Sequence, residues 1–144
     1  EHAFVGHNEK EARALIKRSL QQQNVPKFEV QLHPGESAGV PNLTLHLEET
    51  PSKPLIWNLA WVEGGLETKV KAGENQGRRL HHENVVREYL ARRVEGVADA
   101  SATLRVPSEA NPQNLKLISW LHDPSTGKVL SATSVPVSTY LGNP

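Results

Sequence analysis

The feature that most constrains this chain is an alternation of apolar and polar residues that begins after Pro26 and recurs in separate short runs. Successive side chains of a strand point to opposite faces, so this period of two is typical of half-buried strands in antiparallel sheets. The alternating positions are Phe28, Val30 and Leu32; Leu43, Leu45 and Leu47; Leu66, Thr68 and Val70; Ala102, Leu104 and Val106; and Leu115, Leu117, Ser119 and Leu121. A last strand is predicted over 129–137, and Pro136 indicates an edge strand or a strand end.

Two segments depart from simple alternation. Residues 55–62 carry apolar side chains on both faces, including Trp57 and Trp61, which predicts the central strand of a sheet. Residues 80–95 fit either a helix or a strand, and the β-branched Val85 and Val86 favour a strand.

Turn signals separate the runs: Pro34-Gly35, Pro51 to Pro54, Gly64-Gly65, Asn111-Pro112 and the hairpin sequence Asp123 to Gly127. Short strands at this spacing are typical of two packed sheets. We therefore expect a mainly β chain, an antiparallel β-sandwich of about seven or eight strands preceded by one N-terminal helix.

The helix is predicted over 8–22, with an apolar stripe at Ala12, Leu15, Ile16 and Leu20. Asn8 is its expected N-cap, and Glu11 three residues later completes a capping box. A lone helix has nothing to bury its stripe against, so we expect a packing partner outside this segment. The division that follows is a helical segment at 1–25 and a β-sandwich domain at 26–144.

Composition excludes several classes of function. The 16 basic and 16 acidic residues cancel, which argues against a nucleic-acid partner because phosphate binding needs a concentrated positive field. The absence of cysteine excludes thiolate nucleophiles and thiolate metal ligands in this chain. No apolar run approaches the roughly 20 residues of a membrane span. Aspartate occurs only at Asp99 and Asp123 and no serine lies in a nucleophile elbow, so no catalytic residue and no cofactor are assigned.

The segment Gly73-Glu74-Asn75-Gln76-Gly77-Arg78-Arg79-Leu80, followed by Asn84-Val85-Val86-Arg87, resembles the signature of an uncharacterised family of secreted bacterial proteins. The family pattern is Gly-Glu-Asn, a small residue, Gly-Arg, Leu, and then Asn-Val-Val-Arg. Gln76 departs from it at the small residue. The resemblance implies a β-rich C-terminal domain after an N-terminal thioredoxin-like domain, in a periplasmic or secreted protein.

The opening Ala3-Phe4-Val5-Gly6 is similar to the family's link into the last helix of the thioredoxin-like domain, which implies that 1–25 is the end of that upstream domain. The family's pair of closely spaced cysteines has no counterpart here. Thiol-disulfide activity therefore cannot be carried onto these residues.

Within the signature, Glu74, Asn75, Arg78, Asn84 and Arg87 are the candidate binding residues, because they would present polar groups from a tight glycine-containing loop. The alternative is a loop that satisfies its own polar groups, including a pair between Glu74 and Arg78.

The adjacent His81 and His82 are the candidate metal ligands, because imidazole suits copper or zinc and the chain has seven histidines. Neighbours on a strand point to opposite faces, so both rings would not readily bind one ion. The alternative is surface histidines.

The three tryptophans, Trp57, Trp61 and Trp120, could form a stacking platform for a sugar or a proline-rich peptide; the alternative is core packing. Arginines between Arg78 and Arg93 are interleaved with glutamates, which favours a solvated face.

The function predicted from these observations is a non-catalytic accessory or interaction domain, whose partner is the upstream thioredoxin-like domain or another protein. One alternative is a periplasmic copper- or zinc-binding module that uses histidines. A second is a fragment of a thiol-disulfide oxidoreductase whose cysteines lie outside this chain.

Overall fold

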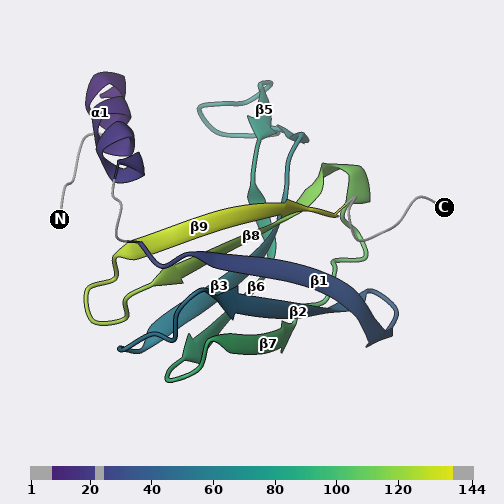
Figure 1. The fold of residues 1–144 in the computed structure, drawn as a ribbon. Coiled ribbons are helices and arrows are strands. Elements are labelled where there is room, and N and C mark those ends of the chain that lie inside the picture. The colour runs from purple at the N-terminus through teal and green to yellow at the C-terminus, as the bar shows by residue number, and fades with distance from the viewer. Residues whose placement is uncertain (1–7, 22–24, 138–144) are drawn as a thin grey trace.

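The alternating runs after Pro26 form nine strands in the computed structural model, which describes residues 8–21 and 25–137 (Figure 1). The elements in chain order are α1 (Glu9–Leu20), β1 (Phe28–Ser37), β2 (Val40–Leu47), β3 (Leu55–Glu63), β4 (Leu66–Lys69), β5 (Arg79–His82), β6 (Val85–Val94), β7 (Asp99–Thr103), a short 3-10 helix (Pro112–Asn114), β8 (Leu115–His122) and β9 (Val129–Pro136). Every strand pair is antiparallel. The predicted mainly β class is confirmed.

Two of the sheets pack face to face around one core. The first has the strand order β1-β2-β7 and the second the order β6-β3-β8-β9, while β4 and β5 form a separate pair. Alternate residues of both larger sheets supply the core, with Leu43, Leu45, Leu59 and Leu117 fully or almost fully buried. Burying such side chains stabilises the fold by about 1.5–3 kcal/mol each.

Strand β3 is the central strand, as the apolar run at 55–62 predicted. It pairs with β6 on one side and β8 on the other. Trp57 and Trp61 are both 0% exposed and point into the core. The Trp57 Nε1–H donates to Ser119 Oγ at 2.8 Å, and the Trp61 Nε1–H donates to the carbonyl of Leu104 at 3.1 Å. These bonds satisfy the only polar atom of each buried indole.

The prediction of a turn at Pro34-Gly35 is wrong. Strand β1 runs through these residues as an irregularity in its pairing with β2, and the chain reverses instead at Ala38 and Gly39, where Gly39 has φ +73°. A Cβ at position 35 would collide with the carbonyl of Val40. The role of Gly35 is therefore to let β1 approach β2 closely, and it does not form a turn.

The ambiguous segment at 80–95 is extended, as the β-branched pair indicated, but it forms two strands and not one. The break falls at Glu83 and Asn84, where Asn84 has φ +55°. This division brings the strand number to nine. Strand β7 also begins earlier than the alternation at 102–106 predicted, because Asp99–Thr103 pairs with β2.

The expectations for the last hairpin are confirmed. The sequence Asp123 to Gly127 connects β8 and β9, with the Gly127 N–H donating to the carbonyl of Asp123 at 2.8 Å. Strand β9 lies at the edge of its sheet, where a proline such as Pro136 is tolerated.

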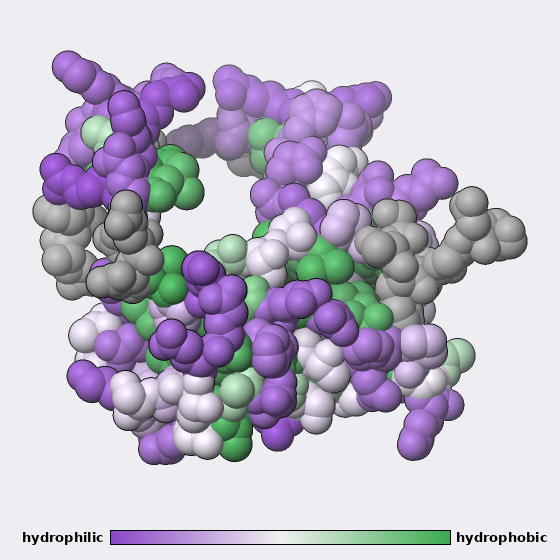
Figure 2. All heavy atoms as spheres, in the orientation of Figure 1, coloured by the Kyte–Doolittle hydropathy of each residue, from purple (hydrophilic) through white to green (hydrophobic). Residues whose placement is uncertain are grey.

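Helix α1 begins at the predicted cap: Asn8 Oδ1 accepts from the Glu11 N–H at 3.2 Å, and Asn8 Nδ2 donates to Glu11 Oε2 at 2.8 Å. None of its residues is buried. Ile16 is 59% exposed and Leu20 is 82% exposed, and Figure 2 shows hydrophobic surface on the helix open to solvent. The described residues contain no helix with the length and hydrophobicity needed to cross a lipid bilayer.

Candidate functional site

The signature block folds into a two-stranded ribbon and its base. Strands β4 and β5 pair only with each other and project away from the two packed sheets (Figure 1). An isolated pair of strands is marginally stable in water, so contacts across the ribbon matter. Glu67 supplies two of them, with Oε2 lying 3.5 Å from Arg79 Nη1 and Oε1 lying 3.2 Å from His81 Nδ1.

The tip of the ribbon closes on its own backbone. The Val70 N–H donates to Arg78 O at 3.0 Å, Gly77 N–H to Val70 O at 2.9 Å, and Arg78 N–H to Asn75 O at 3.0 Å. Gly73 and Gly77 adopt φ values of +86° and +84°, which glycine reaches without strain. Thus backbone hydrogen bonds within the loop define its path.

Glu74, Asn75 and Arg78 are exposed at this tip. Among the residues described, no ion pair joins Glu74 to Arg78, so the pairing considered from sequence is not formed. The tip therefore presents both charges freely.

The base of the ribbon holds Asn84 and Arg87. Asn84 adopts a left-handed conformation, which asparagine tolerates better than most residues. It borders a hollow of about 320 Å³ that is also lined by Gly64, Gly65, Glu83, Asn114 and Lys116. The Gly65 N–H donates to Glu83 Oε1 at 3.1 Å across this hollow.

Arg87 is directed by a β-bulge. Trp61 pairs with Glu88 and Val62 pairs with Val86, so Arg87 is the extra residue on β6. Its Nη1 lies 3.2 Å from Oε2 of Glu63, whose side chain is 4% exposed. The other oxygen of Glu63 accepts the N–H of Asn111 at 2.8 Å. The structure therefore uses Arg87 to compensate a buried carboxylate.

The five candidate binding residues consequently form two groups. Glu74, Asn75 and Arg78 lie at the tip, whereas Asn84 and Arg87 lie at the base, separated by the length of β5, about 13 Å for four extended residues. A small-molecule ligand would therefore not contact both groups of residues.

The two candidate metal ligands face different partners. His81 Nδ1 lies near Glu67, whereas His82 Nε2 lies 3.1 Å from Thr68 Oγ1. The strand alternation thus separates the rings, as expected. Within 8–21 and 25–137, no group of three or more histidine, aspartate or glutamate side chains is arranged to hold a metal ion.

A second site was not anticipated as such from the sequence. On the outer face of the four-stranded sheet, Tyr89 and Trp120 stack with ring centroids 5.9 Å apart and an interplanar angle of 25°. Asn58, which is 0% exposed, lies beneath them and accepts from the Tyr89 hydroxyl at 2.6 Å. Its Nδ2 lies 2.8 Å from His122 Nδ1. The three tryptophans therefore do not form one platform. Trp57 and Trp61 are buried in the core, and only Trp120 lies on this outer face.

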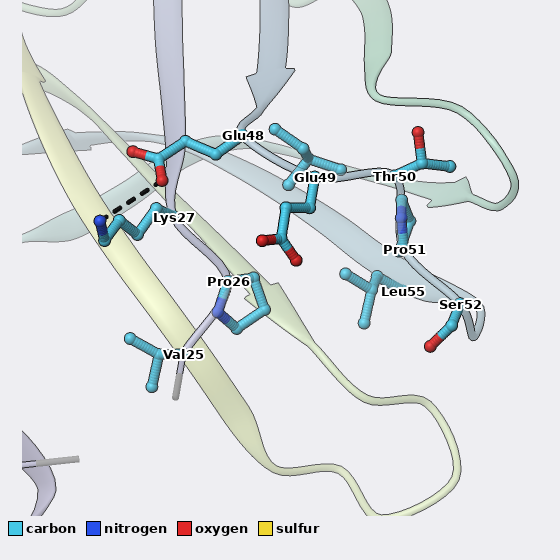
Figure 3. A pocket seen from close by; sticks show the side chains of 10 residues that line it. Val25, Pro26, Lys27, Glu48, Glu49, Thr50, Pro51, Ser52 and Leu55 are labelled. Carbon is cyan, nitrogen blue, oxygen red and sulfur yellow. Dashed lines mark ion pairs between the residues drawn. The ribbon is translucent and has the colours of Figure 1, made fainter. Parts of the chain in front are cut away.

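A groove of about 570 Å³ lies between the residues that lead into β1 and the connection from β2 to β3 (Figure 3). Pro26 and Leu55 form part of its lining, and Glu49 points toward its centre. Lys27 Nζ and Glu48 Oε2 pair across its rim at 3.4 Å. The groove is open and of mixed polarity, and the described residues place no cluster of reactive groups in it.

Two exposed groups have shifted pKa values. The hydrogen bond with Asp99, and then the charge of Asp99, raise the pKa of His46, whose Nδ1 lies 2.7 Å from Asp99 Oδ1. Hydrogen bonds from the Ser125 hydroxyl and the Ser125 N–H lower the pKa of Asp123. Both pairs join neighbouring strands or shape a turn, and neither lies in the ribbon.

Comparison with known proteins gives one family match. Residues 1–122 match the family described as "Protein of unknown function (DUF1223)". No curated protein and no solved structure matches the chain.

Proposed function

Because the chain belongs to the family described as "Protein of unknown function (DUF1223)", we propose that it serves as a non-catalytic accessory or interaction domain in a secreted, thioredoxin-like protein. In this proposal, 1–25 ends an upstream thioredoxin-like domain, and 26–144 is the β-domain that binds that domain or its protein partner.

The observation that carries the proposal is the uncovered stripe of α1. A helix of 12 residues is marginal on its own in water, and in proteins such helices are stabilised by burying an apolar face. Here Leu15 is only partly covered, and Ile16 and Leu20 are mostly exposed. A partner packed on this stripe would supply the missing burial.

The ribbon supports the same role. Backbone hydrogen bonds and the contacts of Glu67 join its two strands, while Glu74 and Arg78 are exposed at its tip. A projecting element that is fixed internally and charged at its end suits recognition of a protein surface.

The test uses the 144-residue chain and, as a separate polypeptide, the upstream thioredoxin-like domain without the last helix that 1–25 would supply. We expect isothermal titration calorimetry to detect their association. Ile16→Asp should weaken it by about tenfold or more, because a buried isoleucine contributes about 1.5–3 kcal/mol. Ala14→Asp, on the opposite side of α1, is the matched control and should change the affinity by less than about twofold.

The native protein should be longer than these 144 residues or part of a complex. Intact-mass analysis should find a longer polypeptide that contains a cysteine pair, or a second chain that co-purifies. Turnover of a substrate by the 144-residue chain without any added domain would contradict the non-catalytic role.

A further inference from the structure

We propose that the outer face of the four-stranded sheet binds a proline-rich peptide segment in the polyproline II conformation, with Tyr89 and Trp120 at the centre of the site. This inference is independent of the role proposed for α1 and the ribbon, because it rests on a different surface.

Strand register defines this face. The outward positions are Val86, Tyr89, Ala91 and Arg93 on β6; Ile56, Asn58, Ala60 and Val62 on β3; Lys116, Ile118, Trp120 and His122 on β8; and Val129, Ala132, Ser134 and Pro136 on β9. Tyr89 is 50% exposed, Val86 58% and Val129 54%. Val86 and Tyr89 are neighbours on β6 and Tyr89 stacks on Trp120, whereas Val129 lies at the diagonally opposite corner of the face. The exposed apolar and aromatic surface around Tyr89 is of the kind that marks an interaction site.

The opposite outer face of the sandwich is different in kind. On the three-stranded sheet, register brings together polar side chains only: Glu29, Gln31, His33, Asn42, Thr44, His46, Asp99, Ser101 and Thr103. A sandwich needs apolar residues on its inner faces alone. The aromatic and aliphatic residues on the other face are therefore not required by the architecture.

A buried network holds the Tyr89 ring in place, and the Trp120 ring stacks on Tyr89. The Tyr89 hydroxyl donates to Asn58 Oδ1, and Asn58 Nδ2 lies 3.0 Å from the carbonyl of Ile56, 3.3 Å from that of Trp120 and 2.8 Å from His122 Nδ1. A fully satisfied buried amide of this kind fixes geometry. Rings that are already oriented lose little conformational freedom on binding a ligand.

The hydrogen-bonding groups left over on this face are mainly donors. Trp57 and Trp61 use their indole N–H groups inside the core, whereas the Trp120 Nε1–H has no hydrogen-bond partner among the described residues. His122 Nδ1 faces Asn58, and its Nε2 has no hydrogen-bond partner among the described residues, which leaves that atom available to a ligand.

Acceptors are scarce by comparison. The sixteen outward positions include no carboxylate, and the single amide, Asn58, is 0% exposed and already bonded. A proline-rich segment matches this imbalance, because proline has no backbone N–H and presents carbonyl acceptors beside apolar rings. Sugar hydroxyls donate as well as accept, and they would find few acceptors here.

Charge favours an acidic residue beside the prolines. Arg93 and Lys116 are the charged residues of this face, at opposite ends of it. Arg93 is already paired with Glu95, its Nη2 lying 2.9 Å from Oε2, while Lys116 forms no ion pair within the part of the chain that the structure describes. Lys116 is thus the group that a flanking carboxylate would meet.

The test measures the fluorescence polarisation of a labelled peptide of ten prolines followed by two glutamates. A glycine-serine peptide of the same length and charge is the control ligand. We expect saturable binding of the first peptide only. Trp120→Ala should weaken it by about tenfold or more, as for a central aromatic contact. Trp120→Phe, which keeps a ring and removes the N–H, should weaken it by about fivefold.

Two further variants separate the contributions. Lys116→Gln should weaken binding of the glutamate-bearing peptide and leave ten prolines alone unaffected. Gln31→Ala, on the opposite outer face, should leave both affinities unchanged. Circular dichroism and urea unfolding establish that each variant is folded before its affinity is interpreted, and Trp120→Phe tests the site if Trp120→Ala fails to fold.

Three results would overturn the proposal. The first is no saturable binding of the proline peptide up to millimolar concentration. The second is equal binding by wild type and Trp120→Phe. The third is that a neutral hexasaccharide or a single-stranded oligonucleotide binds more tightly than the peptide and loses that binding in the Trp120 variants.

Discussion

The buried pair of Glu63 and Arg87 gives the sharpest prediction about stability. Glu63 is 3% exposed; one of its oxygens accepts the Asn111 N–H, and the other has only the Arg87 guanidinium, at 3.2 Å, to balance its charge. Breaking a buried pair by removing one partner costs about 3–5 kcal/mol, because an uncompensated charge stays inside. The Arg87 side chain is 26% exposed, so we expect Arg87→Ala to cost about 3 kcal/mol, the lower end of that range.

The reverse replacement should cost much less. Glu63→Gln keeps an oxygen for the Asn111 N–H and leaves no buried charge. Arg87 keeps access to water, and its Nη2 lies 3.9 Å from Oε2 of the exposed Glu109. We expect Glu63→Gln to cost about 1 kcal/mol. The double variant Glu63→Gln, Arg87→Ala should recover about 2 kcal/mol relative to the sum of the single changes, since neither partner is left alone.

Urea unfolding at neutral pH, followed by tryptophan fluorescence and by circular dichroism, measures these differences. A loss of 3 kcal/mol corresponds to a fall in melting temperature of about 6–12 °C for a chain of this size. Arg93→Ala is the control: it breaks an exposed pair with Glu95 and should cost less than about 1 kcal/mol. Two results would show that Arg87 does not compensate the buried charge of Glu63. The first is a free energy of unfolding for Arg87→Ala within about 0.5 kcal/mol of wild type, and the second is a loss for Glu63→Gln as large as that for Arg87→Ala.

Three further predictions concern the core and the titrating pairs. Leu59→Ala should cost about 2–5 kcal/mol in urea unfolding, because Leu59 is 0% exposed between the sheets and the change leaves a cavity. The bond with Asp99 raises the pKa of His46 above its usual 6.5, so it stabilises the fold below that value and the benefit is lost as pH rises through the raised pKa. The stability difference between wild type and Asp99→Asn should therefore be present at about pH 5.5 and shrink by about pH 9. Hydrogen bonds from Ser125 lower the pKa of Asp123 below its usual 3.8, so they stabilise the turn above that value; the difference between wild type and Asp123→Ala should persist at about pH 6 and vanish as pH falls to about 2.

The sequence predicted those features of the fold that depend on local pattern. Alternation located most of the strands, because a half-buried strand must place every second side chain in the core. The two-sided apolar run around Trp57 and Trp61 identified the central strand β3 for the same reason. The cap at Asn8 was predictable since its bond to the Glu11 N–H spans only three residues.

The errors in the fold arose where a partner strand decides the outcome. Pro34-Gly35 has the composition of a turn, yet the residues lie in β1 because pairing with β2 absorbs them as an irregularity. The break at Asn84 depends similarly on where β5 stops pairing with β4. Neither pairing is visible in the residues at the break itself.

The sequence predicted which residues belong to the candidate site, but not how they are arranged in space. Arg87 was recognised as part of a signature, but its partner Glu63 lies on another strand and is reached only because a bulge turns the arginine inward.

Trp120 is a different case, because its outward position follows from the sequence. In the run at 115–121 the alternation places Leu117 and Leu121 in the core, so the same period places Trp120 on the outside. That signal was present in the sequence.

The exposed aromatic pair and the buried amide beneath it explain each other. Asn58 costs free energy in a position that could hold an apolar residue, since a buried amide must be fully bonded. Covering by Tyr89 and Trp120 removes it from water, and its bonds in turn hold the Tyr89 hydroxyl and the His122 ring. Had these rings served only to cover β3, an aliphatic residue at position 58 would have packed against them without that cost. The polar network is better explained by a need to fix the Tyr89 hydroxyl and the His122 ring beside Trp120.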